Sequence, residues 1–385
     1  MDFQETTERA MLREAVGKIA ADFGHDYFAA KVKAGEHTTE LWQAVGRGGY
    51  LGVNVPEAYG GGGMGIAELA VVAEELGAHG CPLMLLMVSP AICATIIARY
   101  GTDAQRDRWL PGLASGELKL SFAITEPDAG SNSHRLATVA ARHGDRWRLR
   151  GTKYYISGVD EADAVLVVTR TGTDEATGRG RLSLFLVDAD AAGLERTLIP
   201  LEIAAPEKQF TLFFDDVEVD ADRLLGTEGD GLRQVFLGLN PERIIGAAGI
   251  NGIARYALGK AAAYANQRQV WGAPIGAHQG LSHPLAVAYI NVELARLMTQ
   301  KAAWAHDSGL PGAGEAANMA KYAAAEAGLQ AIDAAIQTHG GNGFASEYGL
   351  ADLWGMARVL RTAPVSREMI LNYVAEHSLG LPRSY

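Results

Sequence analysis

The hydrophobic pattern of this 385-residue chain changes its period twice, and that change limits the folds open to it. Up to about residue 115, apolar residues such as Leu12, Val16 and Ile19 recur at the spacing of a helix with one buried face. Strand-like patterns replace them from about Leu118, and helical spacing returns after the polar run TEGDG near residue 228. The sequence therefore predicts an α+β fold with an N-terminal helical domain (1–117), a middle β domain (118–228) and a C-terminal helical domain (229–385).

Four apolar segments of the middle region differ in their pattern. RWRLR (146–150) and RLSLFLV (181–187) alternate, which is typical of strands with one face in water. AVLVV (164–168) and FTLFF (210–214) are continuous, which predicts strands buried on both faces. The last third of the chain is rich in Ala and Gly, and such small residues would let its helices approach closely in an antiparallel bundle.

Local signals divide the N-terminal region. Thr102 and Gln105 form a capping-box pattern, which predicts a short helix that ends at Pro111. The glycine run YGGGGMG (59–65) lacks the strand-to-helix context of a phosphate-binding loop, so we predict a flexible connector. The apolar segment 70–97 is expected to line a core or a pocket between helices.

Charge and composition exclude several classes of protein. The formal net charge of -11, with no basic patch, is unlike that of nucleic-acid-binding proteins. Cys81 and Cys93 lack the spacing of metal ligands, so we expect buried thiols in a reducing compartment and no metal site. The N-terminal start is acidic and polar, unlike a signal or transit peptide, and no apolar run could span a bilayer. The expected location is the cytoplasm.

Three stretches carry the chemical signal of the chain. In FAITEPDAGS (122–131), a hydrophobic run breaks into a turn that presents hydroxyl groups and backbone amides, so a flat polar molecule could dock there. RGTKYYISG (150–158) and HGGNGF (339–344) follow it along the chain. Each stretch alone would be an ordinary loop. Together and in this order they resemble the acyl-CoA dehydrogenase family.

The resemblance covers nearly the whole chain and implies both a fold and a cofactor. The implied fold has an N-terminal helical domain, a middle β-barrel-like domain and a C-terminal four-helix bundle, with FAD lying between them. FAITEPDAGS is similar to the stretch that contacts the flavin ring. RGTKYYISG is similar to a second flavin stretch, with Tyr155 and Ser157 where the family usually has Trp and Thr.

A further segment, RQVWGAPIGAHQG (268–280), is similar to the one by which a neighbouring subunit binds the FAD diphosphate and adenosine. The resemblance therefore implies a homo-oligomer, a homotetramer or a homodimer. The positions that it assigns to the cofactor are Phe122, Ile124, Thr125, Tyr155, Ser157, Arg268, Trp271, Gln279, Gln337, Gly340, Gly341 and Ser366. Arginine suits a diphosphate because its planar fork matches phosphate oxygens, and glycine because it lets backbone amides approach closely.

Three further positions are assigned to the acyl-CoA by the same resemblance. Ser131 matches a residue that touches the CoA arm, and Asn240 matches one that bonds the pantetheine arm. Arg243 is expected to order the site or the acyl end of the substrate.

The catalytic base stands at an unusual position. Most members of the family carry a glutamate in a Tyr-Glu-Gly run near the C-terminus, where this chain has Ala-Pro-Val at 363–365. A minority branch places the glutamate on a C-domain helix just before an arginine, and this chain has Asn-Pro-Glu-Arg at 240–243. The resemblance therefore implies Glu242 as the base. The same residues also form an ordinary helix start, with a cap, a proline and an acid.

Pro364 is a second departure from the family. The family holds the thioester oxygen with a flavin hydroxyl group and with the backbone N–H of the residue at this position, and proline has no N–H. Loss of one such donor costs about 3 kcal/mol of transition-state stabilisation. A shifted loop, another donor or a different chemistry stay open at this point.

The implied reaction belongs to fatty acid metabolism. A proton leaves the carbon next to a thioester carbonyl and a hydride leaves the next carbon, which gives a trans-2-enoyl-CoA, and an electron-transferring flavoprotein receives the electrons. A flavoprotein oxidase or monooxygenase of the same fold and a non-catalytic flavin-binding partner are the alternatives. The sequence reveals neither the acyl chain nor whether CoA or an acyl carrier protein carries it.

Overall fold

Helices form the first third of the chain in the computed structural model, which describes residues 5–384. The first part of the polar start interpreted above, residues 1–4, lies outside the described residues. The helices are α1 (Thr7–Ala34), α2 (Thr39–Arg47), α3 (Ile66–Ala78), the π-helix η3 (Met87–Ala94), α4 (Thr95–Tyr100) and α5 (Asp103–Ser115). Most of α3 and nearly all of η3 are buried, which confirms that the segment 70–97 lines a core.

Helix α5 starts where its capping box predicts but ends later. The Thr102 hydroxyl accepts a hydrogen bond from the Gln105 backbone N–H (3.2 Å), and the Gln105 side chain accepts one from the Thr102 N–H (3.0 Å). The predicted end at Pro111 is wrong, because the helix continues to Ser115. Burial of Leu113 and its neighbours outweighs the one helical hydrogen bond that proline cannot make.

The glycine run 59–65 is a packed turn, so the prediction of a flexible connector is wrong. The backbone N–H of Gly62 donates to the Gly52 carbonyl and that of Gly63 donates to the Val55 carbonyl, each at 2.9 Å. A Cβ added at Gly61 would lie 2.1 Å from the Val55 carbonyl oxygen. The glycines are therefore required by the close approach of two backbone segments.

The middle region forms one eight-stranded sheet in the order β6-β7-β3-β2-β4-β5-β8, with β1 paired to β4. Its strands are β1 (Leu120–Ala123), β2 (Val139–His143), β3 (Arg146–Ser157), β4 (Ala164–Thr173), β5 (Gly180–Asp188), β6 (Leu194–Ile199), β7 (Gln209–Asp220) and β8 (Leu224–Leu225). β1 runs parallel to β4, with Leu120 opposite Ala164, and leads directly into the FAITEPDAGS turn.

Two strand patterns behave opposite to prediction. Residues 182–187 of RLSLFLV are buried on both faces, because Leu184 packs into the core shared with the N-terminal helices and Phe185 packs into the core of the sheet. The segment 210–214 alternates instead, with the Phe213 side chain 41% exposed. The alternation predicted for 146–150 is confirmed. Whether a strand face is buried depends on the elements that pack on it from outside the sheet, and the strand's own sequence does not encode that packing.

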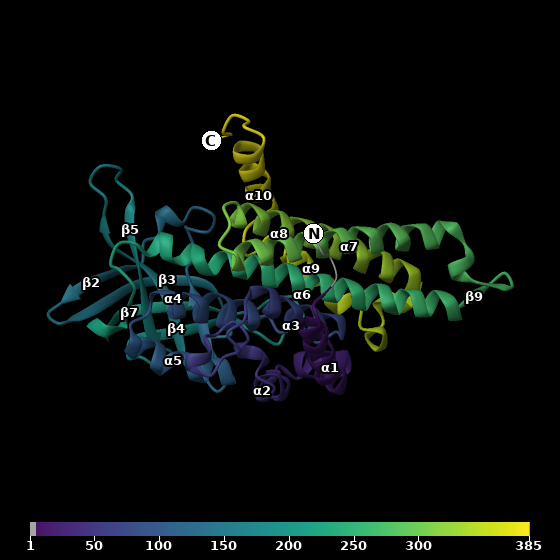
Figure 1. Cartoon of the computed structure of the whole chain (residues 1–385), viewed down its shortest axis with the longest axis horizontal. Coiled ribbons are helices and arrows are strands. Elements are labelled where there is room, and N and C mark those ends of the chain that lie inside the picture. Colours follow the sequence, from purple (N-terminus) through teal and green to yellow (C-terminus); the bar gives the residue numbers. More distant parts are fainter. Residues whose placement is uncertain (1–4, 385) are drawn as a thin grey trace.

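The C-terminal region is the predicted helical bundle. The long helices α6, α7 and α8 lie side by side across the molecule (Figure 1), with the β9 hairpin at the end far from the sheet and α10 projecting from the body. The elements are α6 (Gly231–Gln267), β9 (Gln269–Val270), β10 (Ala273–Pro274), α7 (Gln279–Asp307), α8 (Ala313–His339), α9 (Ala351–Val359) and α10 (Arg367–Tyr373). The fourth bundle helix, α9, packs against α8 and α6. No helix between residues 5 and 384 is long and apolar enough to cross a membrane.

Glycines bring α6 into direct contact with its neighbours, as the small-residue composition predicts. A Cβ added at Gly252 would lie 2.0 Å from the Glu74 carbonyl oxygen, and one at Gly77 would lie 2.5 Å from the Gly249 carbonyl oxygen. The backbones of α3 and α6 therefore touch at their crossing. Larger side chains at these positions would push the two helices apart.

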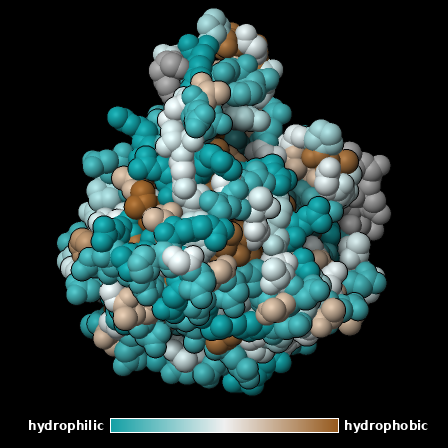
Figure 2. Space-filling model, turned by 90° about the vertical axis from the view of Figure 1, so that its left-hand side faces the viewer, coloured by the Kyte–Doolittle hydropathy of each residue, from teal (hydrophilic) through white to brown (hydrophobic). Residues whose placement is uncertain are grey.

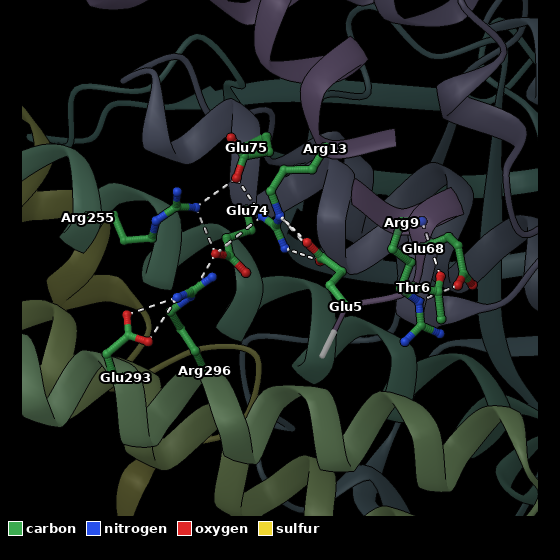
Figure 3. Close-up of polar contacts among 10 residues, drawn as sticks. All are labelled: Glu5, Thr6, Arg9, Arg13, Glu68, Glu74, Glu75, Arg255, Glu293 and Arg296. Atoms are coloured by element: carbon green, nitrogen blue, oxygen red, sulfur yellow. Dashed lines mark hydrogen bonds and ion pairs between the residues drawn. The ribbon is translucent and has the colours of Figure 1, made fainter. Parts of the chain in front are cut away.

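A network of buried charges joins the N-terminal helices to the bundle (Figure 3). Glu74 and Glu75, adjacent on α3, face Arg13 from α1, Arg255 from α6 and Arg296 from α7. Arg255 lies 2.8 Å from Glu74 and 2.7 Å from Glu75, and Arg296 lies 2.8 Å from Glu74. Both carboxylates are buried, so each needs these partners.

The end of the molecule that carries the sheet has a different character. Figure 2 shows that this end is mostly hydrophilic, with hydrophobic residues scattered over it in small groups. Scattered apolar residues of this kind are normal on a surface in contact with water.

Replacing Glu74 by Gln should destabilise the whole fold, because three arginines would lose a buried counter-ion that ties four helices together. We expect a loss of about 3 kcal/mol in the free energy of unfolding, measured by chemical denaturation. The matched control is Glu14→Gln, which breaks the exposed pair of Glu14 with Lys18. The control should leave the unfolding midpoint unchanged. Equal effects of the two variants would contradict a structural role for the network.

Candidate active site

A buried lysine joins the two stretches assigned to the flavin. The Lys153 ammonium donates to the Ile124 carbonyl (3.0 Å) and to the Glu126 carboxylate (2.9 Å), and Lys153 has no exposed surface. The Tyr154 backbone N–H donates to the Thr125 carbonyl (2.9 Å). FAITEPDAGS and RGTKYYISG therefore lie side by side as a single surface.

Burial and charge act in opposite directions on this pair. Burial lowers the pKa of Lys153 to about 8, against the attraction of Glu126. Burial alone would raise the pKa of Glu126, but the Lys153 charge and the backbone N–H groups of Ala137 and Thr138 lower it overall. Each charge of the pair thus depends on the other to remain ionised inside the protein.

The side chains predicted to meet the flavin differ in exposure. Tyr155 is 51% exposed and has a positive φ of 58°, which is uncommon for a residue other than glycine. The Ser157 hydroxyl donates to the Gln209 side chain (2.9 Å). Phe122 is half-buried, and Ser131 lies exposed on the turn. Tyr155 and Ser157 thus present an aromatic face and a hydroxyl group at the end of strand β3.

Glu242 lies inside α6, and the interpretation of residues 240–242 as a helix start is wrong. The helix begins at Gly231 and continues through Pro241, because residues on both sides of the proline are buried against other elements. Gly238 and Gly246, one turn before and after Glu242, lie against η3. A Cβ at Gly238 would meet Ile92 at 3.0 Å, and one at Gly246 would meet the Met87 sulfur at 2.9 Å. Glu242 therefore sits on a helix face packed against apolar residues.

The carboxyl group of Glu242 has no direct partner in the described part of the chain. Among residues 5–384, no side chain or backbone group forms a hydrogen bond or ion pair with it. Glu242 is half-buried, and burial raises its pKa to about 7, although the charges of Arg243 and Lys321 pull it down. Such a carboxyl group exchanges a proton readily near neutral pH.

Three residues around Glu242 define its surroundings. Arg243 is 7% exposed, and its guanidinium donates to the Asn240 side chain (3.1 Å), so two of the three predicted substrate residues lie beside the glutamate. Cys93 lies on η3, and the charge of Glu242 adds to burial in raising the pKa of its thiol. Lys321 lies on α8, and its charge acts on Glu242. Sequence reasoning missed Lys321, whose signal was a single lysine in the alanine-rich segment 316–336.

Six of the predicted cofactor residues lie elsewhere, around the β9 hairpin and the adjoining ends of α7 and α8. They are Arg268, Trp271, Gln279, Gln337, Gly340 and Gly341, all of them exposed. Trp271 is 90% exposed at the tip of the hairpin. The helical segment from Glu242 to Gln267 spans roughly 37 Å. A single chain therefore does not bring the two groups of predicted residues together (Figure 1).

Ser366, the last of the predicted cofactor residues, lies in the segment between α9 and α10. The Ser366 hydroxyl accepts a hydrogen bond from the Met369 N–H (3.2 Å) and caps α10. It also lines a polar cavity of about 230 Å³ with Arg358, Arg361 and Arg367. Arginine and hydroxyl groups suit phosphate oxygens. Contact of Ser366 with a cofactor stays a prediction.

Comparison with known proteins gives this site its context. Models of the N-terminal, middle and C-terminal domains of acyl-CoA dehydrogenases match residues 6–117, 121–217 and 229–379. Acyl-CoA dehydrogenase FadE12 of Mycobacterium tuberculosis is 56% identical over 384 residues, which cover 100% of this chain and 99% of FadE12. The chain belongs to the acyl-CoA dehydrogenase family.

Two solved structures of this family's fold are similar along their full length. A glutaryl-CoA dehydrogenase in complex with glutaryl-CoA has a TM-score of 0.93 and 31% identity, covering 100% of this chain and 98% of the other. The FAD complex of PigA has a TM-score of 0.91 and 26% identity, covering 99% of this chain and 100% of the other. This acyl-CoA dehydrogenase homologue is thus an oxidoreductase that uses FAD, as the sequence predicts.

The residues present fit FAD at both of its ends. The joined stretches around Thr125 and Ser157 offer an aromatic face and hydroxyl groups to a flat ring system. At the hairpin end, Arg268 carries a positive charge, and a Cβ added at Gly340 or Gly341 would meet no atom within 4 Å. The open glycine backbone and the arginine suit a diphosphate.

Replacing Lys153 by Met should reduce FAD retention, because the two joined stretches would separate and the buried Glu126 would lose its counter-ion. We expect purified protein with a lower ratio of flavin to protein absorbance and an unfolding free energy lower by about 3 kcal/mol. Arg150→Met is the matched control, since Arg150 lies on the same strand and forms an exposed pair with Asp216. Full FAD content in Lys153→Met would show that the pair does not organise the cofactor surface.

Proposed function

We propose that this protein oxidises an acyl-CoA thioester to the trans-2-enoyl-CoA, with Glu242 as the base that removes the α proton. The observation that carries the proposal is the state of Glu242, a half-buried carboxyl group with a pKa of about 7 and no hydrogen-bond partner among residues 5–384. Most buried polar groups that serve only the fold have a hydrogen-bond partner. An unpaired carboxyl group with this pKa is suited to accept a proton from carbon.

The surrounding residues support each requirement of this reaction. Glu242 takes the proton of the α carbon, and the apolar face formed with Met87 and Ile92 excludes water from that transfer. Arg243 and Asn240, bonded to each other, orient the thioester and its pantetheine arm. Ser131 meets the CoA arm on the exposed turn. FAD, when bound, supplies the acceptor for the hydride that leaves the β carbon.

We further propose that each complete site takes residues from two copies of the chain. The group around Phe122 and the group around Arg268 stand at opposite ends of α6, and the second group is exposed on the hairpin end. Helix α7 supports an assembly, because Val287, Ile290 and Leu294 form an apolar stripe along it and are 48%, 56% and 59% exposed. Such a stripe is typical of a surface that another subunit covers. The assembly is a homotetramer or a homodimer.

The electron acceptor that we propose is an electron-transferring flavoprotein. Transfer to oxygen, as in an oxidase or monooxygenase of the same fold, is the alternative. Rapid reoxidation in air with release of peroxide would favour the oxidase, and slow reoxidation in air would favour the protein acceptor. A non-catalytic flavin-binding protein would show no reduction by any acyl thioester.

Reduction of the bound flavin by an acyl-CoA should depend on pH through Glu242. The base must be ionised to accept the α proton, and its pKa is raised to about 7, so the rate of flavin bleaching should rise with pH through about 7 and level off above. The measurement is anaerobic stopped-flow absorbance with a panel of acyl-CoAs. Glu242→Gln should reduce the rate by at least about a hundredfold while FAD stays bound.

Glu347→Gln is the control, because Glu347 is an exposed glutamate in the loop beyond α8. It should leave the pH profile unchanged. Equal bleaching rates in the wild type and in Glu242→Gln would remove Glu242 from the role of base.

Two inactive variants should complement each other if a site spans two chains. Arg268→Ala should lose FAD and Glu242→Gln should lose proton abstraction, each in its own half of the site. Co-expression of the two, with different tags and purification of the mixed oligomer, should restore part of the activity, because some sites combine two intact halves. No recovery in a mixed oligomer that is shown to form would mean that one chain holds the whole site.

A further inference from the structure

Lys321 is a buried lysine that has no carboxylate partner among the residues that the structure describes. Its side chain is 1% exposed, and its ammonium group donates to the Val365 backbone carbonyl. Within the described part of the chain, residues 5–384, no carboxylate lies within 4.0 Å of this ammonium group. Burying a charge without a counter-ion lowers the stability of the fold. Fold stability therefore does not explain the position of Lys321.

Charged groups from three helices face Lys321. Glu326, one turn further along α8, already receives Arg361 at 2.7 Å and Arg367 at 3.0 Å. Glu368 on α10 is exposed, with Arg367 at 3.6 Å. Both of these carboxylates are therefore engaged by arginines.

The carboxylate that remains is Glu242 on α6. The charges of Glu242 and Arg243 both act on Lys321. Two further titratable groups lie nearby: the Cys93 thiol on η3 interacts with Glu242, and the Tyr373 hydroxyl on α10 interacts with Arg243. Arg243 is itself bonded to Asn240. Glu242, half-buried, and Lys321, buried, are thus two oppositely charged groups, neither of which has an ion-pair partner within 4.0 Å in residues 5–384.

We propose that Lys321 is a positioning residue for Glu242, which keeps the glutamate in its carboxylate form and holds the 363–366 segment next to it. The proposal rests on the proposed function, because it assumes that Glu242 must be ionised to act. The bond to Val365 lies one residue from Pro364, the position that lacks a backbone donor. Lys321 therefore places a positive charge beside the segment in which the family's donor is missing.

The sign of the expected effect follows from the opposing influences on Glu242. Burial raises its pKa to about 7, and the positive charges of Arg243 and Lys321 lower it. Without Lys321, one of the two charges that favour the carboxylate is lost, so the pKa of Glu242 rises further. A residue that only anchored a loop would change stability or the maximal rate and would leave the midpoint of the pH profile in place.

The test compares the pH dependence of anaerobic flavin reduction in the wild type and in Lys321→Met, with the acyl-CoA that the wild type prefers. Met has a similar length and no charge. We expect the midpoint of Lys321→Met to lie about one pH unit higher, and Lys321→Arg to stay near the wild type. Lys260→Met is the matched control, a half-buried lysine elsewhere on α6 whose loss should not move the midpoint. An unshifted midpoint in Lys321→Met would overturn the proposal.

A second measurement separates failure of this proposal from failure of the proposed function. The pKa of Glu242 is about 7 in the folded protein, which exceeds the 4.5 of a free glutamate. Ionised Glu242 therefore destabilises the folded protein. This loss of stability grows as pH rises from 4.5 to about 7 and is constant above that. The stability gained in Glu242→Gln should therefore increase with pH through this window and then level off. In a Lys321→Met background it should level off about one pH unit higher.

This comparison of stabilities needs no substrate. We call the pH at which the stability gain of Glu242→Gln becomes constant the level-off point. If no acyl-CoA reduces the wild-type flavin, the proposed function fails, and the level-off point still decides the role of Lys321. An identical level-off point in both backgrounds would overturn that role, and a raised one would support it.

Discussion

The contact between α3 and α6 fixes the positions of the other parts of the molecule. Gly77 and Gly252 let the two backbones touch, and no residue with a side chain would fit at Gly252 without moving a helix. This contact sets α6 against the N-terminal helices, with Glu242 facing η3 near one end and the β9 hairpin at the other. The arginines around Glu74 and Glu75 hold the same crossing by charge.

The buried glutamates of this protein show that a raised pKa alone does not identify a base. Glu75 and Glu126 have partners, and their pKa values are lowered overall. Glu207 has a pKa raised to about 7 by burial, yet one oxygen of its carboxyl group accepts a hydrogen bond from the backbone N–H of Met84, which precedes η3. Glu242 combines a raised pKa with the absence of any partner among residues 5–384 and with a packed apolar face. That combination supports the proposal that Glu242 is the base.

The sequence predicted the order of helical and β regions, the family and FAD, because periodicity and short motifs are local properties. It could not predict which strands are covered: residues 182–187 of RLSLFLV are buried on both faces only because helices from another region pack on them. Asn240 and Pro241 look like a helix start, but packing on both sides carries α6 through them. Lys321 was missed because its contact with Val365 joins residues 44 positions apart. The domain limits and the individual site residues stay predictions.

Exchange of the substrate's α hydrogen atoms tests the central claim most directly. An acyl-CoA with oxygen or sulfur in place of the β carbon cannot give up a hydride, so only the proton step remains. The measurement is mass spectrometry of this analogue after incubation in D₂O with FAD-loaded protein. The wild type should exchange the α hydrogens, and Glu242→Gln, with FAD still bound, should not. Equal exchange by both proteins would contradict the assignment of Glu242 as the base.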